Sequence, residues 1–155
     1  LARNGIVKAE ALQQHINLWP LKVALIEALN RSARAHEAAP IALELLERFA
    51  TEPSVCWYPA EMWRRTYECL NASGQRVPAR EALSRGVRWI HDVGLANLPA
   101  MWHEGFKLRQ LTNVALLAAA ALTALAIRLD SKGPVIFRQK RYGFNNELIE
   151  VYKFR

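Results

Sequence analysis

Apolar residues recur every three or four positions from residue 1 to about 110, between prolines and short polar breaks. This spacing is typical of amphipathic helices, and we expect helices over about residues 6–17, 20–35, 37–51, 59–73, 78–93 and 99–110. Pro20 and Pro59 are placed in first helical turns, where the N–H that proline lacks has no intrahelical acceptor. No strand pattern occurs before residue 130, so the sequence predicts a mainly α fold.

A different pattern follows this helical region. Val114 to Ile127 are fourteen uncharged residues, ended by Arg128, and we expect one apolar helix there. A helix that crosses a bilayer needs about twenty apolar residues, so the uncharged stretch is too short to span. Two interpretations stay open: a buried core helix, or a helix that enters one leaflet or lies at its interface.

The last 26 residues, 130–155, predict a β-hairpin. Gly133 and Pro134 cannot continue a helix, and Gly143 with the two asparagines after Phe144 marks a turn between two β-prone runs. Alternation along the first strand places Arg138 and Lys140 on one face, with Gln139 and Arg141 on the other.

The basic residues of this hairpin are the candidate site for a phosphate or a lipid headgroup. The alternative is an ordinary solvated hairpin. The candidate contact residues are Arg138, Lys140, Arg141, Lys153 and Arg155.

The charge of the chain is compatible with an anionic partner. Lys and Arg number 21 against 14 Asp and Glu, for a net charge of +7. No run of five like charges and no aromatic-rich basic strand occurs, so we expect no nucleic-acid partner. Cys56 and Cys69 are not at zinc-ligand spacing, and the four histidines are scattered, so we assign no metal ligand.

Several motifs of the C-terminal region follow one another in a characteristic order. Leu129 to Pro134 read Leu-Asp-Ser-x-Gly-Pro, Val135 to Arg141 form a basic strand, and Tyr152 to Arg155 read Tyr-Lys-Phe-Arg. With the apolar residues before them, from residue 122 to 155, they resemble the bacterial sugar transferases that use polyprenyl phosphate. A Ser-Pro break that bends the family's membrane helix has no counterpart near Leu117 and Ala118.

The resemblance implies transfer of a sugar phosphate from a nucleotide sugar to polyprenyl phosphate, in exopolysaccharide or glycan synthesis. It implies Mg²⁺ for the complete family domain, and an Asp-Glu catalytic pair located after Tyr-Lys-Phe-Arg. We therefore expect no catalytic residue, metal ligand or cofactor within residues 1–155. The implied partner is membrane lipid or polyprenyl phosphate at the cytoplasmic face of a bacterial inner membrane; a core helix would instead place the chain in the cytoplasm.

A second resemblance concerns residues 20–120. Trp63, Gly74, Ala79, Leu83 and Gly86 follow the order of large and small residues in one tetratricopeptide repeat. A looser copy starts at Lys22, and the segment resembles the tetratricopeptide-like helical tails of bacterial signalling regulators. This resemblance implies a helical array that binds a protein partner and has no chemistry of its own.

Together these patterns predict a tetratricopeptide-like antiparallel helical array over 1–110, an apolar membrane-associated or core helix over 111–129, and the truncated start of a sugar transferase domain over 130–155. The predicted function is that of a fragment of a membrane-associated glycosyl-1-phosphate transferase. The alternative is a non-enzymatic interaction module of a bacterial regulator.

Overall fold

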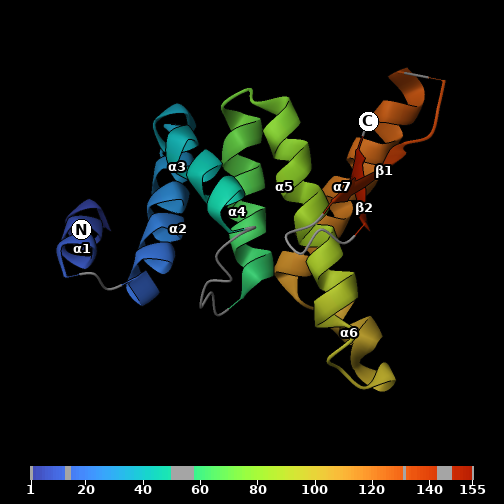
Figure 1. The fold of residues 1–155 in the computed structure, drawn as a ribbon, viewed down its shortest axis with the longest axis horizontal. Helices are drawn as coiled ribbons and strands as arrows, with labels where there is room; N and C mark the ends of the chain where they lie inside the picture. The colour runs from blue at the N-terminus through green and yellow to red at the C-terminus, as the bar shows by residue number, and fades with distance from the viewer. Residues whose placement is uncertain (1, 13–14, 50–57, 131, 143–147, 155) are drawn as a thin grey trace. The chain divides into compact units, whose positions relative to one another are not determined.

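A computed structural model describes residues 2–12, 15–49, 58–130, 132–142 and 148–154 of the chain (Figure 1). The chain divides into two compact units, Leu1–Ala82 and Leu83–Arg155, and each is described by itself. The prediction of a mainly α chain that ends in one apolar helix and a β-hairpin is confirmed. The sequence-based boundaries at residues 110 and 129 stay predictions.

The first unit is built from α1 (Ala2–Ala11), α2 (His15–Arg31), α3 (Ala35–Arg48), α4 (Pro59–Ala72) and the start of α5 (Arg76–Trp89). Its core is apolar, with small residues on α3 that allow neighbouring helices to approach closely. Ala38, Ala42, Leu45, Ile26 and Leu70 are all buried. The core of this unit is therefore made by the apolar faces of α2, α3 and α4.

Pro20 is an exception to the predicted helix ends. It lies inside α2, five residues after the helix begins at His15, and not in a first turn. A proline in a helix interior removes one backbone hydrogen bond and costs roughly 3 kcal/mol. Leu18 and Trp19, just before it, are buried in the core of the unit. Their burial favours continuing the helix and offsets that cost. Pro59, in contrast, opens α4 as predicted.

Two inter-helical turns of this unit share one construction. Ala33 after α2 and Gly74 after α4 both have positive φ, +56° and +80°. In each turn the next N–H reaches back five residues, from Arg34 to the Leu29 carbonyl and from Gln75 to the Leu70 carbonyl, at 2.8 Å. This is the Schellman arrangement of a helix C-terminus. Ala33 and Gly74 lie 41 positions apart along the chain.

This pair of turns gives a matched test of backbone strain. Ala33 is exposed and adopts a left-handed conformation that disfavours a Cβ, so Ala33→Gly is expected to stabilise the chain by about 0.5–1 kcal/mol. Gly74→Ala should destabilise it by about 1 kcal/mol, although a Cβ there meets no atom within 4 Å. Urea unfolding of both variants measures the difference. Changes in unfolding free energy that are equal in size and sign for the two variants would contradict backbone strain at Ala33.

Ion pairs and one thiol complete the first unit. Arg65 of α4 forms an ion pair with Glu27 of α2 at 2.7 Å, and Lys22 of α2 forms one with Glu44 of α3 at the same distance.

Cys69 is buried, and burial raises the pKa of its thiol to about 11, so it stays a protonated, unreactive side chain at neutral pH.

The second unit continues α5 into a five-residue π-helical segment, η1 (Ile90–Gly94). A 3₁₀ turn, η2 (Ala100–Trp102), leads into α6 (His103–Leu108) and then α7 (Leu111–Asp130). Strands β1 (Ile136–Tyr142) and β2 (Leu148–Phe154) pair antiparallel. The predicted turn residues Gly143, Asn145 and Asn146 lie outside the described residues.

Candidate functional site

The β-hairpin contains the predicted contact residues, and its register fixes their neighbours. Arg138 lies opposite Tyr152, and Lys140 opposite Glu150. The Arg138 guanidinium reaches diagonally to the Glu150 carboxylate at 2.6 Å, and the Tyr152 hydroxyl donates to the same carboxylate at 3.0 Å. Glu150 thus neutralises Arg138, whereas Lys140, directly opposite Glu150 in the register, is exposed.

The remaining predicted contact residues are described only in part. By backbone register Arg141 pairs with Ile149, and Lys153 with Phe137, while their side chains lie outside what the structure describes. Arg155 lies outside the described residues altogether. The predicted division of Arg138 and Lys140 from Gln139 and Arg141 follows from this two-residue alternation. Their role in binding stays a prediction.

The outer edge of β2 is held by α5, a contact that the sequence did not reveal. The Ser84 hydroxyl and the Arg88 guanidinium both donate to the Tyr152 carbonyl, each at 3.0 Å. A two-stranded hairpin has unpaired carbonyls along its edges and is marginal alone. Two donors on one such carbonyl therefore stabilise the position of β2 within this unit.

Helix α7 is longer than the uncharged stretch suggested. It runs 20 residues from Leu111 to Asp130, a length of about 30 Å, which matches the hydrocarbon thickness of a bilayer. Only 17% of its most apolar window is buried, whereas a soluble core helix would be mostly covered. Exposed apolar residues follow the whole length of the helix, and one row of them at helical spacing is Leu111, Ala115, Ala118, Leu122, Leu125 and Leu129. Length and exposure agree with a membrane helix, and the expectation that it is too short to span is wrong on length.

The start of α7 is tied to the segment before it. Asn113 is fully buried, and its amide donates to the Phe106 carbonyl at 2.9 Å. The Phe106 ring packs on η1, where a Cβ built on Gly94 would lie 2.7 Å from a ring carbon. Gly94 is buried, so a side chain there has little room to be accommodated.

We expect Gly94→Ala to destabilise the chain by about 1.5 kcal/mol, because the added methyl group must displace the Phe106 ring. Thermal unfolding followed by circular dichroism measures the loss. Gly105→Ala is the matched control, since a Cβ at that position meets nothing within 4 Å. Equal stability of the two variants would show that Phe106 moves freely and does not fix α6.

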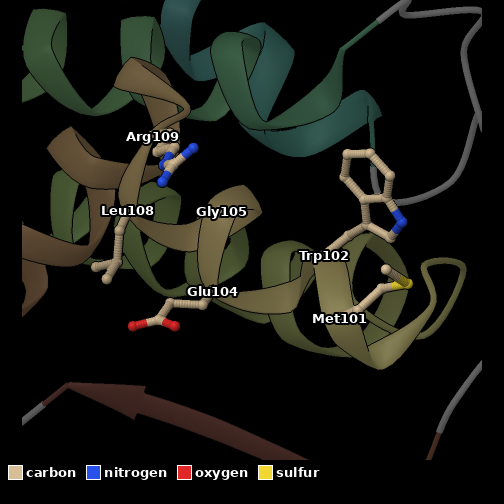
Figure 2. A pocket seen from close by; sticks show the side chains of 6 residues that line it. All are labelled: Met101, Trp102, Glu104, Gly105, Leu108 and Arg109. Atoms are coloured by element: carbon tan, nitrogen blue, oxygen red, sulfur yellow. The ribbon is translucent and has the colours of Figure 1, made fainter.

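A hollow of about 500 Å³ lies on α6 and the turn before it. Met101, Trp102, Glu104, Gly105, Leu108 and Arg109 line it. Figure 2 shows Met101 and Trp102 extending from the 3₁₀ turn on one side of the hollow, and Arg109 rising from the end of α6. The sequence predicted none of these residues as a site, although Met and Trp shortly before a long apolar helix were a usable signal.

The family resemblance implies Mg²⁺, but the described residues do not offer a fitting set of ligands for it. No group of three or more His, Cys, Asp or Glu side chains there is arranged to hold a metal ion. The Glu150 carboxylate already accepts from Arg138 and Tyr152. Mg²⁺ needs near-octahedral oxygen ligation, usually with one or two carboxylates, so no step through a metal is assigned to these residues.

Comparison with known proteins relates part of the second unit to a known family. Residues 106–155 match the bacterial sugar transferase family. The match begins at Phe106 and contains α7 and the hairpin; we refer to residues 106–155 as the transferase segment. The predicted resemblance of this region to the family is confirmed.

Curated relatives of the transferase segment cover short stretches of much longer proteins. An undecaprenyl-phosphate glucose phosphotransferase from Komagataeibacter xylinus is 57% identical over 42 residues, 27% of this chain and 8% of that protein. A UDP-glucose:undecaprenyl-phosphate glucose-1-phosphate transferase from Escherichia coli (strain K12) is 38% identical over 68 residues, 43% of this chain and 15% of that protein.

A third relative is the exopolysaccharide production protein PSS of Rhizobium leguminosarum bv. phaseoli, 62% identical over 32 residues, which is 21% of this chain and 16% of that protein. The chain thus spans less than a fifth of the length of these relatives. No solved structure matches the chain.

Proposed function

We propose that the transferase segment is the membrane-proximal start of an enzyme that transfers glucose 1-phosphate from UDP-glucose to undecaprenyl phosphate. The observation that carries this proposal is the coincidence of the family match with a bilayer-length helix followed by a basic hairpin. Two relatives at 57% and 38% identity carry names that specify glucose transfer to undecaprenyl phosphate. The cytoplasmic face of the inner membrane is the place where such a lipid phosphate and a nucleotide sugar meet.

Within this enzyme the chain positions the segment at the membrane and supplies positive charge for phosphates. Phosphoryl transfer depends on positioning the phosphates and neutralising their charge. Helix α7 holds the segment at the lipid, and Lys140 presents an ammonium group to a phosphate at the headgroup level. The nucleophilic carboxylate and the metal ligands belong to a region of the enzyme beyond residues 1–155, as the family resemblance implies.

A graft into the Komagataeibacter relative tests this function. The part of that relative that aligns with residues 106–155 is replaced by the transferase segment of this chain, and transfer of labelled glucose phosphate from UDP-glucose to undecaprenyl phosphate is measured in membranes. We expect the graft to retain activity within about tenfold of the parent. A second graft carrying Lys140→Glu is expected to raise the KM for the lipid phosphate, and Lys132→Glu, an exposed cation before the strand, serves as its control.

Two results would contradict parts of this proposal. An inactive graft that still reaches the membrane at the parent's level would contradict the proposal. Transfer activity of the purified 155-residue chain would contradict the placement of the catalytic carboxylates outside it.

A second function, protein interaction, is proposed for residues 1–110. The paired turns at Ala33 and Gly74 support a repeated helical hairpin, an architecture that presents extended binding surfaces. Its test is photocrosslinking in cells from an unnatural residue placed at Val77, which is 75% exposed. We expect one discrete protein adduct, and its absence there and at exposed Val7 would contradict the interaction.

A further inference from the structure

The run from η2 through α6 has an outer face that no described residue covers. Met101 is 85% exposed, Leu108 64% and Trp102 62%. Met101, Glu104, Gly105 and Leu108 follow one another at spacings of three, one and three, so they lie on one side of the helical run. Three large apolar side chains so strongly exposed within eight residues indicate a binding surface.

The opposite side of η2 and α6 is held by contacts with neighbouring residues of the same unit. The His103 ring Nε2 lies 2.9 Å from the Leu98 carbonyl. Phe106 packs on Gly94, and its carbonyl accepts from buried Asn113. Because these inner contacts fix the rotation of α6, the exposure of Met101 and Leu108 is a property of the fold and not of a helix that is free to turn.

Charge beside this outer face favours an anionic occupant. Lys107 and Arg109 flank Leu108, and Glu104 is the one acidic residue between Pro99 and Arg109. Arg109 lies at the hollow of about 500 Å³ that Trp102 and Met101 also line, as Figure 2 shows. Glu104 also lines the hollow, so Arg109 with the neighbouring Lys107 leaves a net positive charge beside apolar walls, which is the chemistry that receives the phosphate of a lipid headgroup.

Continuity with α7 identifies the occupant as a bilayer. Helix α7 begins three residues after Leu108, and its first residue, Leu111, is 82% exposed. Tryptophan combines an apolar ring with an N–H donor, and it concentrates at the level of lipid headgroups. A Trp-Met-Leu surface at the entry of a membrane-length helix therefore lies where the bilayer interface would be.

We propose that the outer face of η2 and α6, formed by Met101, Trp102, Leu108 and Arg109, is an interfacial anchor that binds the anionic phospholipid surface at the N-terminal end of α7. This inference rests on the proposed function, because it takes α7 to enter the bilayer. By holding its N-terminal end, the anchor fixes the depth at which α7 enters the bilayer.

The test places an environment-sensitive fluorophore on the full chain. Met101→Cys in a Cys56→Ser background is labelled with a nitrobenzoxadiazole group, while Cys69, being buried, reacts slowly. The control carries the label at Val77→Cys, which is 75% exposed in the other unit. Vesicles of phosphatidylglycerol and of phosphatidylcholine are added, and sedimentation measures total binding.

We expect a blue shift at position 101, larger with phosphatidylglycerol, and none at position 77. Replacing Trp102 and Leu108 by serine should weaken sedimentation with phosphatidylglycerol vesicles about tenfold. Arg109→Gln should lower the preference for the anionic lipid by about fivefold and leave binding to phosphatidylcholine unchanged.

A chain that sediments with vesicles but shows no shift at position 101 would overturn the anchor and leave membrane entry of α7 intact. A chain that does not sediment at all would overturn both.

Discussion

Leu122→Asp is expected to reduce the partition of the chain into lipid vesicles about a hundredfold. Leu122 is 68% exposed in the middle of α7, where the fold itself leaves it uncovered. An aspartate at the centre of a membrane helix costs about 2.5–3.5 kcal/mol on insertion scales, which corresponds to a loss of this size. Sedimentation with vesicles across a range of lipid concentrations measures it.

The control for this prediction is Val77→Asp, an equally drastic change at a more exposed residue of the first unit. It should leave partition unchanged. Unfolding of both variants without lipid should show similar, small changes in stability, because both side chains face solvent. If Leu122→Asp instead destabilises the lipid-free chain and leaves partition unaltered, α7 is a core helix.

Glu44→Gln is expected to lower the free energy of unfolding by about 2 kcal/mol. Lys22, only 6% exposed, donates to both carboxylate oxygens of Glu44 at 2.7 Å and lies 5.6 Å from the centre of the Trp19 ring. Removing the carboxylate leaves a buried ammonium without its counter-charge, which costs 3–5 kcal/mol in a fully buried pair. Because the Glu44 side chain is 33% exposed, solvent reduces the loss.

The same pair predicts a pH dependence of stability. Partial burial acts to raise the pKa of Glu44, but the hydrogen bonds and charges of Lys22 and Arg48 together hold the pKa below its ordinary value of 4.5. A carboxyl with a lowered pKa stabilises the fold above its ordinary pKa and loses that contribution as the pH falls through the lower, folded value. Urea unfolding at successive pH values should show this loss in the natural chain and a smaller one in Glu44→Gln. Glu47→Gln, on the same helix but exposed, is the control; an equal effect of both substitutions would contradict the role of Lys22.

Local sequence determined the elements of this protein well. Apolar spacing located α3 and α4 to within three residues at each end, since a helix must bury one stripe of side chains whatever its neighbours are. It placed the end of α1 six residues too late and the start of α2 five residues too late, so the expected helix over 6–17 ran across the break between them. Gly133 and Pro134 set the break after α7, and strict alternation set the faces of the hairpin. The ordered motifs from Leu129 onward identified the transferase segment, because they are contiguous along the chain.

Helix interiors and turns were less predictable. Pro20 was expected at a helix start and lies within α2, where the burial of Trp19 outweighs the local preference. Ala33 was read from its spacing as part of a helix, whereas it ends one in a left-handed turn. Local helix preference alone predicted neither outcome.

The site depended most on contacts between distant residues. The sequence determined that a basic hairpin follows an apolar helix, and both are properties of contiguous residues. Only the tertiary structure showed that Glu150 forms an ion pair with Arg138. It also showed that Ser84 and Arg88 donate hydrogen bonds to the Tyr152 carbonyl. The exposure of Met101 and Trp102 likewise became known only from the structure. Electrostatic pairing and exposure are set by which side chains meet in space, and residues up to 68 positions apart in the sequence meet here.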